Sequence, residues 1–248
     1  MINKSLKNKK IIISAGASGI GLATAKVCLS RGAYVYLCDV DNKSLNKLNK
    51  HSLKNKRLFT FNCDASDESQ VSDLFKKIVK KTKKIDALIN NVGIAGPTGS
   101  LDKLKSKDWE RTIQVDVNSH FYFTKKAIPL IKKSRNGSII NISSTSARDG
   151  NVGRLSYASS KGAIETFTKV LANELGRYKI RVNSISPGPT NTRMMNENTP
   201  VQLAEKIKEN IPMKRFAEVN DIANVALFLS SDLSTFITGQ NLRVAGGM

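Results

Sequence analysis

The chain has 248 residues, and 40 lysines and arginines stand against 20 aspartates and glutamates, for a formal net charge of +20. Hydrophobic residues make up 40% and charged residues 24%, which excludes a disordered, collagenous or disulfide-scaffold chain. The cysteines, Cys28, Cys38 and Cys63, form no CxxC pair and support neither a metal site nor a disulfide framework. No apolar run has the roughly 18 residues of a membrane helix, so we expect a cytoplasmic protein.

Short β-branched runs alternate with longer helical patterns along the chain. Strands are predicted at residues 10–14, 33–39, 57–63, 85–90, 137–143, 180–186 and 241–245, and helices at 19–31, 42–50, 68–82, 107–132, 157–178 and 220–229. Apolar strands separated by helices indicate a parallel sheet covered on both faces, so we predict one doubly wound α/β domain over residues 1–248. The longest irregular stretch, 187–213, is typical of a substrate lid or loop.

The positive charge does not by itself indicate nucleic-acid binding. Six lysines within residues 76–84 share a segment with apolar residues that recur every three or four positions, which is typical of an amphipathic helix with a solvated lysine face. No aromatic residues interleave with them in the manner of a nucleic-acid footprint. We therefore expect no nucleic-acid partner, although the charge favours anionic solutes.

A glycine-rich turn, residues 14–21 (SAGASGIG), follows the first predicted strand and begins the first helix. Gly16, Gly19 and Gly21 let the backbone approach a pyrophosphate closely, and the helix N-terminus offers N–H groups and a positive dipole. The spacing differs from the G-x-G-x-x-G fingerprint, and a tight strand-to-helix turn without a ligand is the alternative. The position of the turn favours a dinucleotide site.

Asp39 ends the second predicted strand, where a carboxylate can accept both ribose hydroxyls of an adenosine and repel a 2′-phosphate. Val40 and Asp41 follow it, so no arginine stands beside it to bind such a phosphate. The sequence therefore predicts NAD as the cofactor and makes NADP less favourable. A helix N-cap is the second, compatible role for this residue.

Tyr157 and Lys161 are four residues apart at the start of a long helical pattern, so the phenol and the ammonium lie on one face. A cation beside a phenol favours phenolate, and such a tyrosine can exchange a proton with an alcohol or a carbonyl. Ser144 ends an upstream strand, where its hydroxyl could bond the reacting oxygen. The neighbouring hydroxyls of Ser143, Thr145 and Ser146 leave the choice among them open.

Taken in order, these motifs resemble those of the short-chain dehydrogenase/reductase family over nearly the whole chain. The matching positions are the turn 14–21, Asp39, the segment 90–93 (NNVG), Asn118, Ser144, Tyr157 and Lys161. The resemblance implies a Rossmann-type domain with a seven-stranded parallel sheet, and reversible hydride transfer between a nicotinamide cofactor and an alcohol or ketone. It also implies a homotetramer that uses the helices at 107–132 and 157–178.

The resemblance assigns catalytic roles to four residues. Tyr157 is the expected general acid/base, and Lys161 its charged partner and a ligand of the nicotinamide ribose. Ser144 is expected to orient the substrate oxygen, and Asn118 to hold a proton-relay water. The cofactor is expected to contact Ser14, Gly16, Ser18, Gly19, Ile20, Gly21, Asp39, Asp64, Ala65, Asn91, Gly93, Tyr157, Lys161, Pro187, Gly188, Thr190 and Thr192. Two departures stand out: Ser14 and Ala15 replace the usual Thr-Gly, and Val92 replaces an alanine.

The expected function is NAD-dependent oxidation of a secondary alcohol, or the reverse reduction of a ketone. Arg148 and Arg154 flank the loop between Ser144 and Tyr157 and could bind an anionic substrate; exposed loop charges or subunit contacts are the alternative. A 3-oxoacyl-acyl-carrier-protein reductase is the second enzyme hypothesis, against which Asp39 argues because that activity generally implies NADPH. A non-catalytic NAD-binding regulator is the hypothesis from another class.

Overall fold

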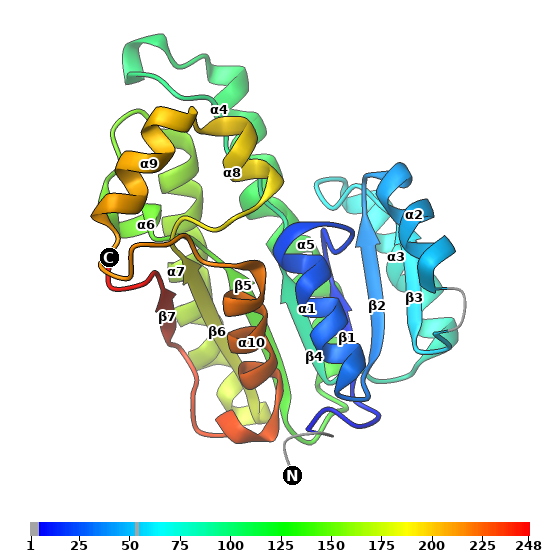
Figure 1. The fold of residues 1–248 in the computed structure, drawn as a ribbon. Coiled ribbons are helices and arrows are strands. Elements are labelled where there is room, and N and C mark those ends of the chain that lie inside the picture. Colours follow the sequence, from blue (N-terminus) through cyan, green and yellow to red (C-terminus); the bar gives the residue numbers. More distant parts are fainter. Residues whose placement is uncertain (1–4, 53–54) are drawn as a thin grey trace.

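One seven-stranded parallel sheet organises the computed structural model, which describes residues 5–52 and 55–248 (Figure 1). Its strand order is β3-β2-β1-β4-β5-β6-β7. The strands are β1 (Lys10–Ile13), β2 (Tyr34–Asp39), β3 (Leu58–Asn62), β4 (Ala87–Asn90), β5 (Gly137–Ile142), β6 (Ile180–Pro187) and β7 (Asn241–Val244). All seven predicted strands are present, and the doubly wound fold is confirmed.

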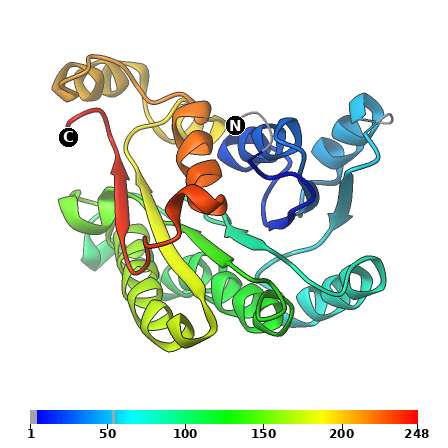
Figure 2. The same ribbon diagram turned by 90° about the horizontal axis from the view of Figure 1, so that it is seen from below.

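Helices pack on both faces of this sheet, as Figure 2 shows from below. The principal helices are α1 (Gly19–Ser30), α2 (Asn42–Ser52), α3 (Glu68–Lys81), α4 (Ser106–Ile113), α5 (Ser119–Ile131), α6 (Ser146–Asp149), α7 (Leu155–Leu175), α8 (Arg193–Asn198), α9 (Val201–Asn210) and α10 (Val219–Ser230). Alternate strand residues point to opposite faces, so Ile12 packs with α3, α5 and α7, whereas Ile11 and Ile13 pack with α1, α2 and α10.

The chain order reverses between β1 and β4, which are neighbours in the sheet although β2 and β3 separate them in sequence. At such a switch point the loops after the two strands diverge to opposite faces and leave a crevice at the carboxyl ends. The glycine-rich turn follows β1 and the NNVG segment follows β4. Both predicted cofactor segments therefore lie at the carboxyl ends of these two central strands.

The helix predicted over 107–132 is interrupted, which corrects that prediction. Residues Gln114–Asn118 form a π-helical turn that joins α4 to α5. The turn contains Asp116, which is fully buried and accepts hydrogen bonds from two segments distant in sequence. The apolar periodicity of the segment does not encode such tertiary bonds, so the sequence predicted one continuous helix.

The stretch 187–213 is not irregular throughout, contrary to the prediction. It contains the two helices α8 and α9, and the Thr192 hydroxyl caps α8 by accepting from Met195 N at 3.2 Å. Polar residues and prolines concealed the helical pattern, because both helices lack fully buried side chains. The segment returns to the body of the protein through a parallel bridge between Thr190 and Ala217.

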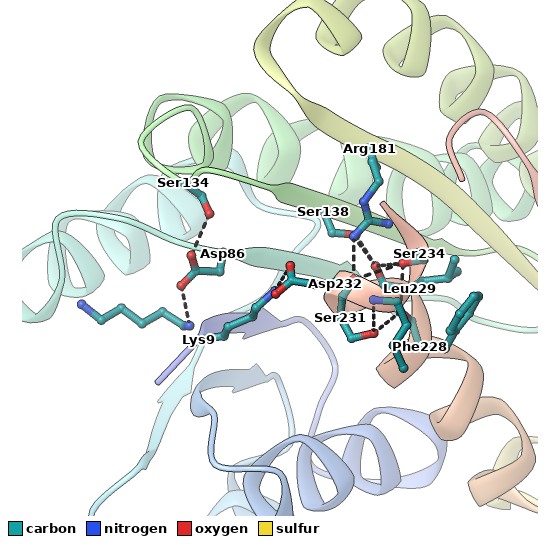
Figure 3. Close-up of polar contacts among 12 residues, drawn as sticks. Lys9, Asp86, Ser134, Ser138, Arg181, Phe228, Leu229, Ser231, Asp232 and Ser234 are labelled. Carbon is teal, nitrogen blue, oxygen red and sulfur yellow. Dashed lines mark hydrogen bonds and ion pairs between the residues drawn. The ribbon is translucent and has the colours of Figure 1, made fainter. Parts of the chain in front are cut away.

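Polar contacts fix the opposite, amino end of the sheet (Figure 3). The last carbonyl groups of α10 accept from the sheet: Leu229 O accepts from Ser138 Oγ and from Arg181 Nη2, both at 2.8 Å. Asp86 accepts from Lys10 N at 2.9 Å and from Ser134 Oγ at 2.7 Å. These bonds satisfy groups that helix and strand ends leave unpaired, and they leave the carboxyl end free for a site.

Candidate active site

A cavity of about 560 Å³ lies at the carboxyl ends of the central strands. Its wall is built from the glycine-rich turn, the segment after β4, the loop after β5, the first turns of α7, and the α8–α9 segment. The volume falls within the range of small-molecule and cofactor sites. The sheet thus brings together residues as far apart in the chain as Ala15 and Met248.

Tyr157 and Lys161 face this cavity from adjacent turns of α7. Lys161 Nζ lies 5.7 Å from the centroid of the Tyr157 ring. The lysine side chain is only 4% exposed, and Nζ donates to Ile142 O at 3.2 Å. The cation is therefore held in place beneath the tyrosine, as the i, i+4 spacing predicted.

Asp116 is the buried counterion of this lysine, at 3.9 Å between Oδ2 and Nζ. Its Oδ1 accepts from Ile94 N at 2.8 Å and its Oδ2 from Ser160 Oγ at 2.9 Å. Burial raises the pKa of Asp116 above its ordinary value, while the Lys161 cation and the two hydrogen bonds oppose that rise. The carboxylate thus joins α7 to the segment after β4, a role that sequence analysis missed. The only signal was an acidic residue between Val115 and Val117.

The hydroxyl groups after β5 differ in whether they already donate a hydrogen bond within the protein. Ser143 Oγ donates to Lys161 O at 2.9 Å, so this hydroxyl is used in tying the strand to α7. Ser144 lines the cavity, and its Oγ accepts from Ser146 N at 3.2 Å, which leaves its proton free to donate. Ser146 accepts instead from Asn151 Nδ2 at 3.0 Å. The geometry favours Ser144 over Ser143 as the hydroxyl that meets a ligand.

The glycine-rich turn is braced by the segment after β4. Asn91 Nδ2 donates to Ala15 O at 2.8 Å, and Asn91 N donates to Ser14 Oγ at 3.1 Å. Ala15 has a φ of +49°, a left-handed conformation that suits glycine, which occupies this place in the family pattern. A β-carbon at Gly21 would clash with Ala15 O. These contacts hold the turn against the start of α1.

The start of α1 fits a pyrophosphate. Ser18 is the N-cap, its side chain makes no capping hydrogen bond, and Gly19 and Ile20 line the cavity. The first-turn N–H groups and the helix dipole are thus available to an anion. At Gly93 a β-carbon would lie 2.8 Å from Lys161 Nζ, so the backbone there passes closely over the lysine. The open start of α1 and the close backbone approach at Gly93 therefore fit a dinucleotide.

Asp39 holds the turn rather than a helix end. Its Oδ2 accepts from Ala17 N at 2.9 Å and its Oδ1 from Asp41 N at 3.0 Å. The N-terminal cap of α2 is Asp41, whose Oδ1 accepts from Lys43 N and Ser44 N. Hydrogen bonds from Ser44 hold the pKa of Asp41 below its ordinary value. A carboxylate has about four acceptor positions, so Asp39 retains capacity for ribose hydroxyls.

The predicted site residues divide by their relation to the cavity. Those in its wall are Ser18, Gly19, Ile20, Asn91, Gly93, Ser144, Tyr157, Lys161, Pro187, Gly188, Thr190 and Thr192. The lining does not include Ser14, Gly16, Gly21, Asp39, Asp64, Ala65 or Asn118. Asn118 Nδ2 donates to Gln114 Oε1 at 2.5 Å within the π turn. The wall also contains Leu203 and Ile207, which the sequence analysis did not predict.

Within residues 5–52 and 55–248, no group of three or more His, Cys, Asp or Glu side chains is arranged to hold a metal ion. In the same part of the chain, no helix is long and apolar enough to cross a membrane. Cys28, Cys38 and Cys63 are all buried free thiols.

Comparisons with known proteins agree with this geometry. A family model described as enoyl-(acyl carrier protein) reductase matches residues 14–248. The 3-oxoacyl-[acyl-carrier-protein] reductase of Thermotoga maritima is 36% identical over 245 residues, which cover 98% of each chain. The structure of NAD⁺-bound xylitol dehydrogenase superposes with a TM-score of 0.93 at 30% identity, covering 98% of this chain and 100% of that one. A 3-ketoacyl-(acyl-carrier-protein) reductase from Brucella melitensis, complexed with NADH, gives 0.92 at 30% identity, covering 98% and 99%.

Proposed function

Because this chain belongs to the short-chain dehydrogenase/reductase family of oxidoreductases, we propose that it interconverts a secondary alcohol and a ketone with NAD(H). The observation that carries the proposal is the wall of one cavity. The cavity presents Ser144, Tyr157 and Lys161 to the same space as the start of α1. A proton-transfer group, its cation and a dinucleotide-binding turn thus lie in reach of one ligand.

Each side chain has a distinct part in this chemistry. Tyr157 Oη takes the hydroxyl proton of the alcohol, or returns it to the ketone oxygen. Lys161, fixed by Asp116 and Ile142 O, places a positive charge beside the tyrosine ring. Ser144 donates a hydrogen bond to the reacting oxygen. When bound, a nicotinamide cofactor supplies the acceptor or the donor of the hydride.

The preference for NAD over NADP is proposed from Asp39. Its carboxylate is fixed by Ala17 N and Asp41 N, and it would face a 2′-phosphate with a like charge. The NAD⁺-bound and NADH-bound neighbours support the proposal, since both of those proteins bind the non-phosphorylated cofactor.

Three further properties belong to the proposal. We infer a single domain in which the 187–213 segment, with α8 and α9, closes over the cavity as a lid. Asn118 retains its proposed role in holding a relay water, and Asp64 and Ala65 their proposed contacts with the adenine. The predicted homotetramer and cytoplasmic location stay predictions.

The test is an activity screen with Tyr157→Phe as the blank. Purified protein with NAD⁺ is offered secondary alcohols, hydroxy acids and polyols, and formation of NADH is followed. The variant should lose at least about 100-fold in kcat, because only the acid/base group is removed. Its NADH affinity, measured by calorimetry, should stay within about twofold of the wild type. Full activity in Tyr157→Phe would overturn the assignment.

A 3-oxoacyl-acyl-carrier-protein reductase is the second candidate. The similarity to the Thermotoga maritima and Brucella melitensis proteins favours it. The second of these is complexed with NADH, so Asp39 does not by itself argue against this activity. Turnover of a 3-oxoacyl thioester, together with no activity on any compound of the alcohol screen, would select this candidate. Tight NADH binding without turnover in either assay would select a non-catalytic regulator.

A further inference from the structure

The loop between β5 and α7 carries two arginines, and their surroundings differ. Arg148 lies in α6, where its Nε donates to Glu165 Oε2 at 2.7 Å. Its side chain is 63% exposed and is not part of the cavity wall. Arg148 is thus a neutralised surface residue.

Arg154 is the N-cap residue of α7, three positions before Tyr157, and it lines the cavity. Its guanidinium carbon lies 5.0 Å from the centroid of the Tyr157 ring. Its Nη1 donates to Thr98 Oγ1 at 3.3 Å, on the segment after β4. The guanidinium therefore lies between the tyrosine and the opposite wall of the cavity.

No carboxylate neutralises this guanidinium within the described part of the chain. Arginine has five N–H donors in a fixed fork, and Thr98 takes one of them. The described cavity wall contains Arg154, Lys161 and Arg193 but no Asp or Glu. Of these cations, Lys161 has Asp116 at 3.9 Å and Arg193 has Glu197 at 2.6 Å. Arg154 is thus the cation of the described wall that has no carboxylate partner.

We propose that Arg154 binds an oxyanion of the substrate, and that the natural substrate is a short hydroxy or oxo acid. The inference deepens the proposed function and rests on it. A ligand whose reacting oxygen bonds Tyr157 Oη reaches the guanidinium with a group only a few bonds away. A carboxylate, sulfonate or phosphate there receives two parallel N–H bonds, whereas a neutral ester or thioester receives weaker ones.

The test compares 3-oxobutanoate with its methyl ester, which differ in charge but share the reacting ketone. Reduction by NADH is measured for the wild type, Arg154→Gln and Arg148→Gln, and kcat/KM is taken for both probes. In the wild type the acid should be preferred. In Arg154→Gln the acid should lose about 10- to 100-fold while the ester changes less than about threefold. Arg148→Gln should keep the wild-type preference.

The conservative variant separates charge from geometry. Arg154→Lys keeps one cation but loses the fork, so it should recover part of the preference for the acid. A wild type that prefers the ester, or an Arg154→Gln variant that keeps the wild-type ratio, would overturn the proposal. Equal losses in Arg148→Gln and Arg154→Gln would also overturn it, because they would indicate a general effect of charge.

A binding measurement distinguishes failure of this inference from failure of the proposed function. If the wild type reduces neither probe, the ketone-reductase proposal fails for this substrate class. Calorimetric binding of 3-oxobutanoate to the NADH complex of Tyr157→Phe then decides the anion site. Binding that weakens at least tenfold when Arg154→Gln is added supports the site. Binding that is absent, or that the added substitution does not change, overturns it.

Discussion

A single side chain beside the glycine-rich turn can combine a structural role with a proposed binding role. Asp39 illustrates this, because its carboxylate accepts from the turn at Ala17 N and yet keeps free acceptor positions. A substitution there changes both the turn and the charge that a 2′-phosphate would meet. Measurements on this residue therefore need a readout of the turn as well as one of the cofactor.

Replacing Asp39 with alanine should relax cofactor discrimination. Removal of the negative charge takes away the repulsion of a 2′-phosphate and the acceptor of the ribose hydroxyls. The ratio of kcat/KM for NAD⁺ over NADP⁺ should therefore fall at least about tenfold, from loss of one charged hydrogen bond. Asp39→Asn, which keeps an acceptor for Ala17 N, serves as the control for damage to the turn. An unchanged ratio in both variants would show that Asp39 only braces the turn.

His120 is a buried side chain close enough to Lys161 to be affected by its charge. Burial and the Lys161 cation hold its pKa well below the ordinary histidine range. His120 therefore stays unprotonated in the native state at pH values near 6.5, where the histidine of the unfolded chain binds a proton. The stability that this group contributes is present above that pH and is lost as the pH falls.

Acidification should therefore destabilise the protein more than it destabilises His120→Gln. Between pH 7 and pH 5 one such histidine accounts for about 2 kcal/mol of the free energy of unfolding. The Asp116 carboxyl, whose raised pKa acts in the opposite sense, is present in both proteins and cancels in the difference. Denaturant titrations of both proteins at pH 7 and pH 5 measure this difference in the free energy of unfolding. Parallel pH dependence in the two proteins would contradict the assignment of a neutral buried His120.

At the scale of elements, the glycines in α1 and α7 differ in how closely other atoms pack around them. Gly21 in α1 lies against the glycine-rich turn, where a β-carbon would clash with Ala15 O and lie 2.7 Å from Asn91 Nδ2. A carbonyl oxygen in a braced turn cannot move aside cheaply. Gly162 in α7 has only Ala147 O, at 4.0 Å, near its β-carbon position. The first glycine is required by packing, and the second only weakens its helix.

The two alanine variants should consequently have opposite effects. Gly21→Ala should lower the free energy of unfolding by about 1–3 kcal/mol through overpacking, and it should weaken NADH binding by displacing the turn. Gly162→Ala should raise the free energy of unfolding by about 0.5–1 kcal/mol, because alanine favours the helix. Chemical denaturation and calorimetry measure both. A stabilised Gly21→Ala variant that binds NADH normally would refute the close packing described for the turn.

For the whole molecule, exposed apolar residues on two helices are consistent with the proposed assembly. Phe121 on α5 is 45% exposed and Val170 on α7 is 49% exposed. Both helices cover the same face of the sheet, and the family resemblance assigns them to a tetramer interface. The net charge of +20 would oppose association at low salt, since repulsion between like-charged copies is unscreened there.

Sedimentation should therefore give a particle of about four times the 27.2 kDa chain at physiological ionic strength. Val170→Glu would place a charge in the α7 interface and should shift the particle towards smaller species. The exposed Val152→Glu, in the loop before α7, is the matched control and should leave the assembly unchanged. A wild-type monomer under these conditions would refute the tetramer.

The order of the seven strands followed from the sequence alone, because apolar periodicity depends only on neighbours along the chain. The same holds for the Tyr157 and Lys161 pair, which share one helix face by spacing. The π turn at Gln114–Asn118, the role of Asp116 and the distinction between Ser143 and Ser144 depended on tertiary structure.

Arg148 and Arg154 show why some features of the site could not be predicted from the sequence. They are equivalent in the sequence, six positions apart in one loop. Their environments are set by Glu165 on α7 and by Thr98 after β4, and only folding brings these residues beside them. Local pattern thus predicted the fold, and the family resemblance predicted the reaction class. Contacts between distant segments decided which of the two arginines has a carboxylate partner.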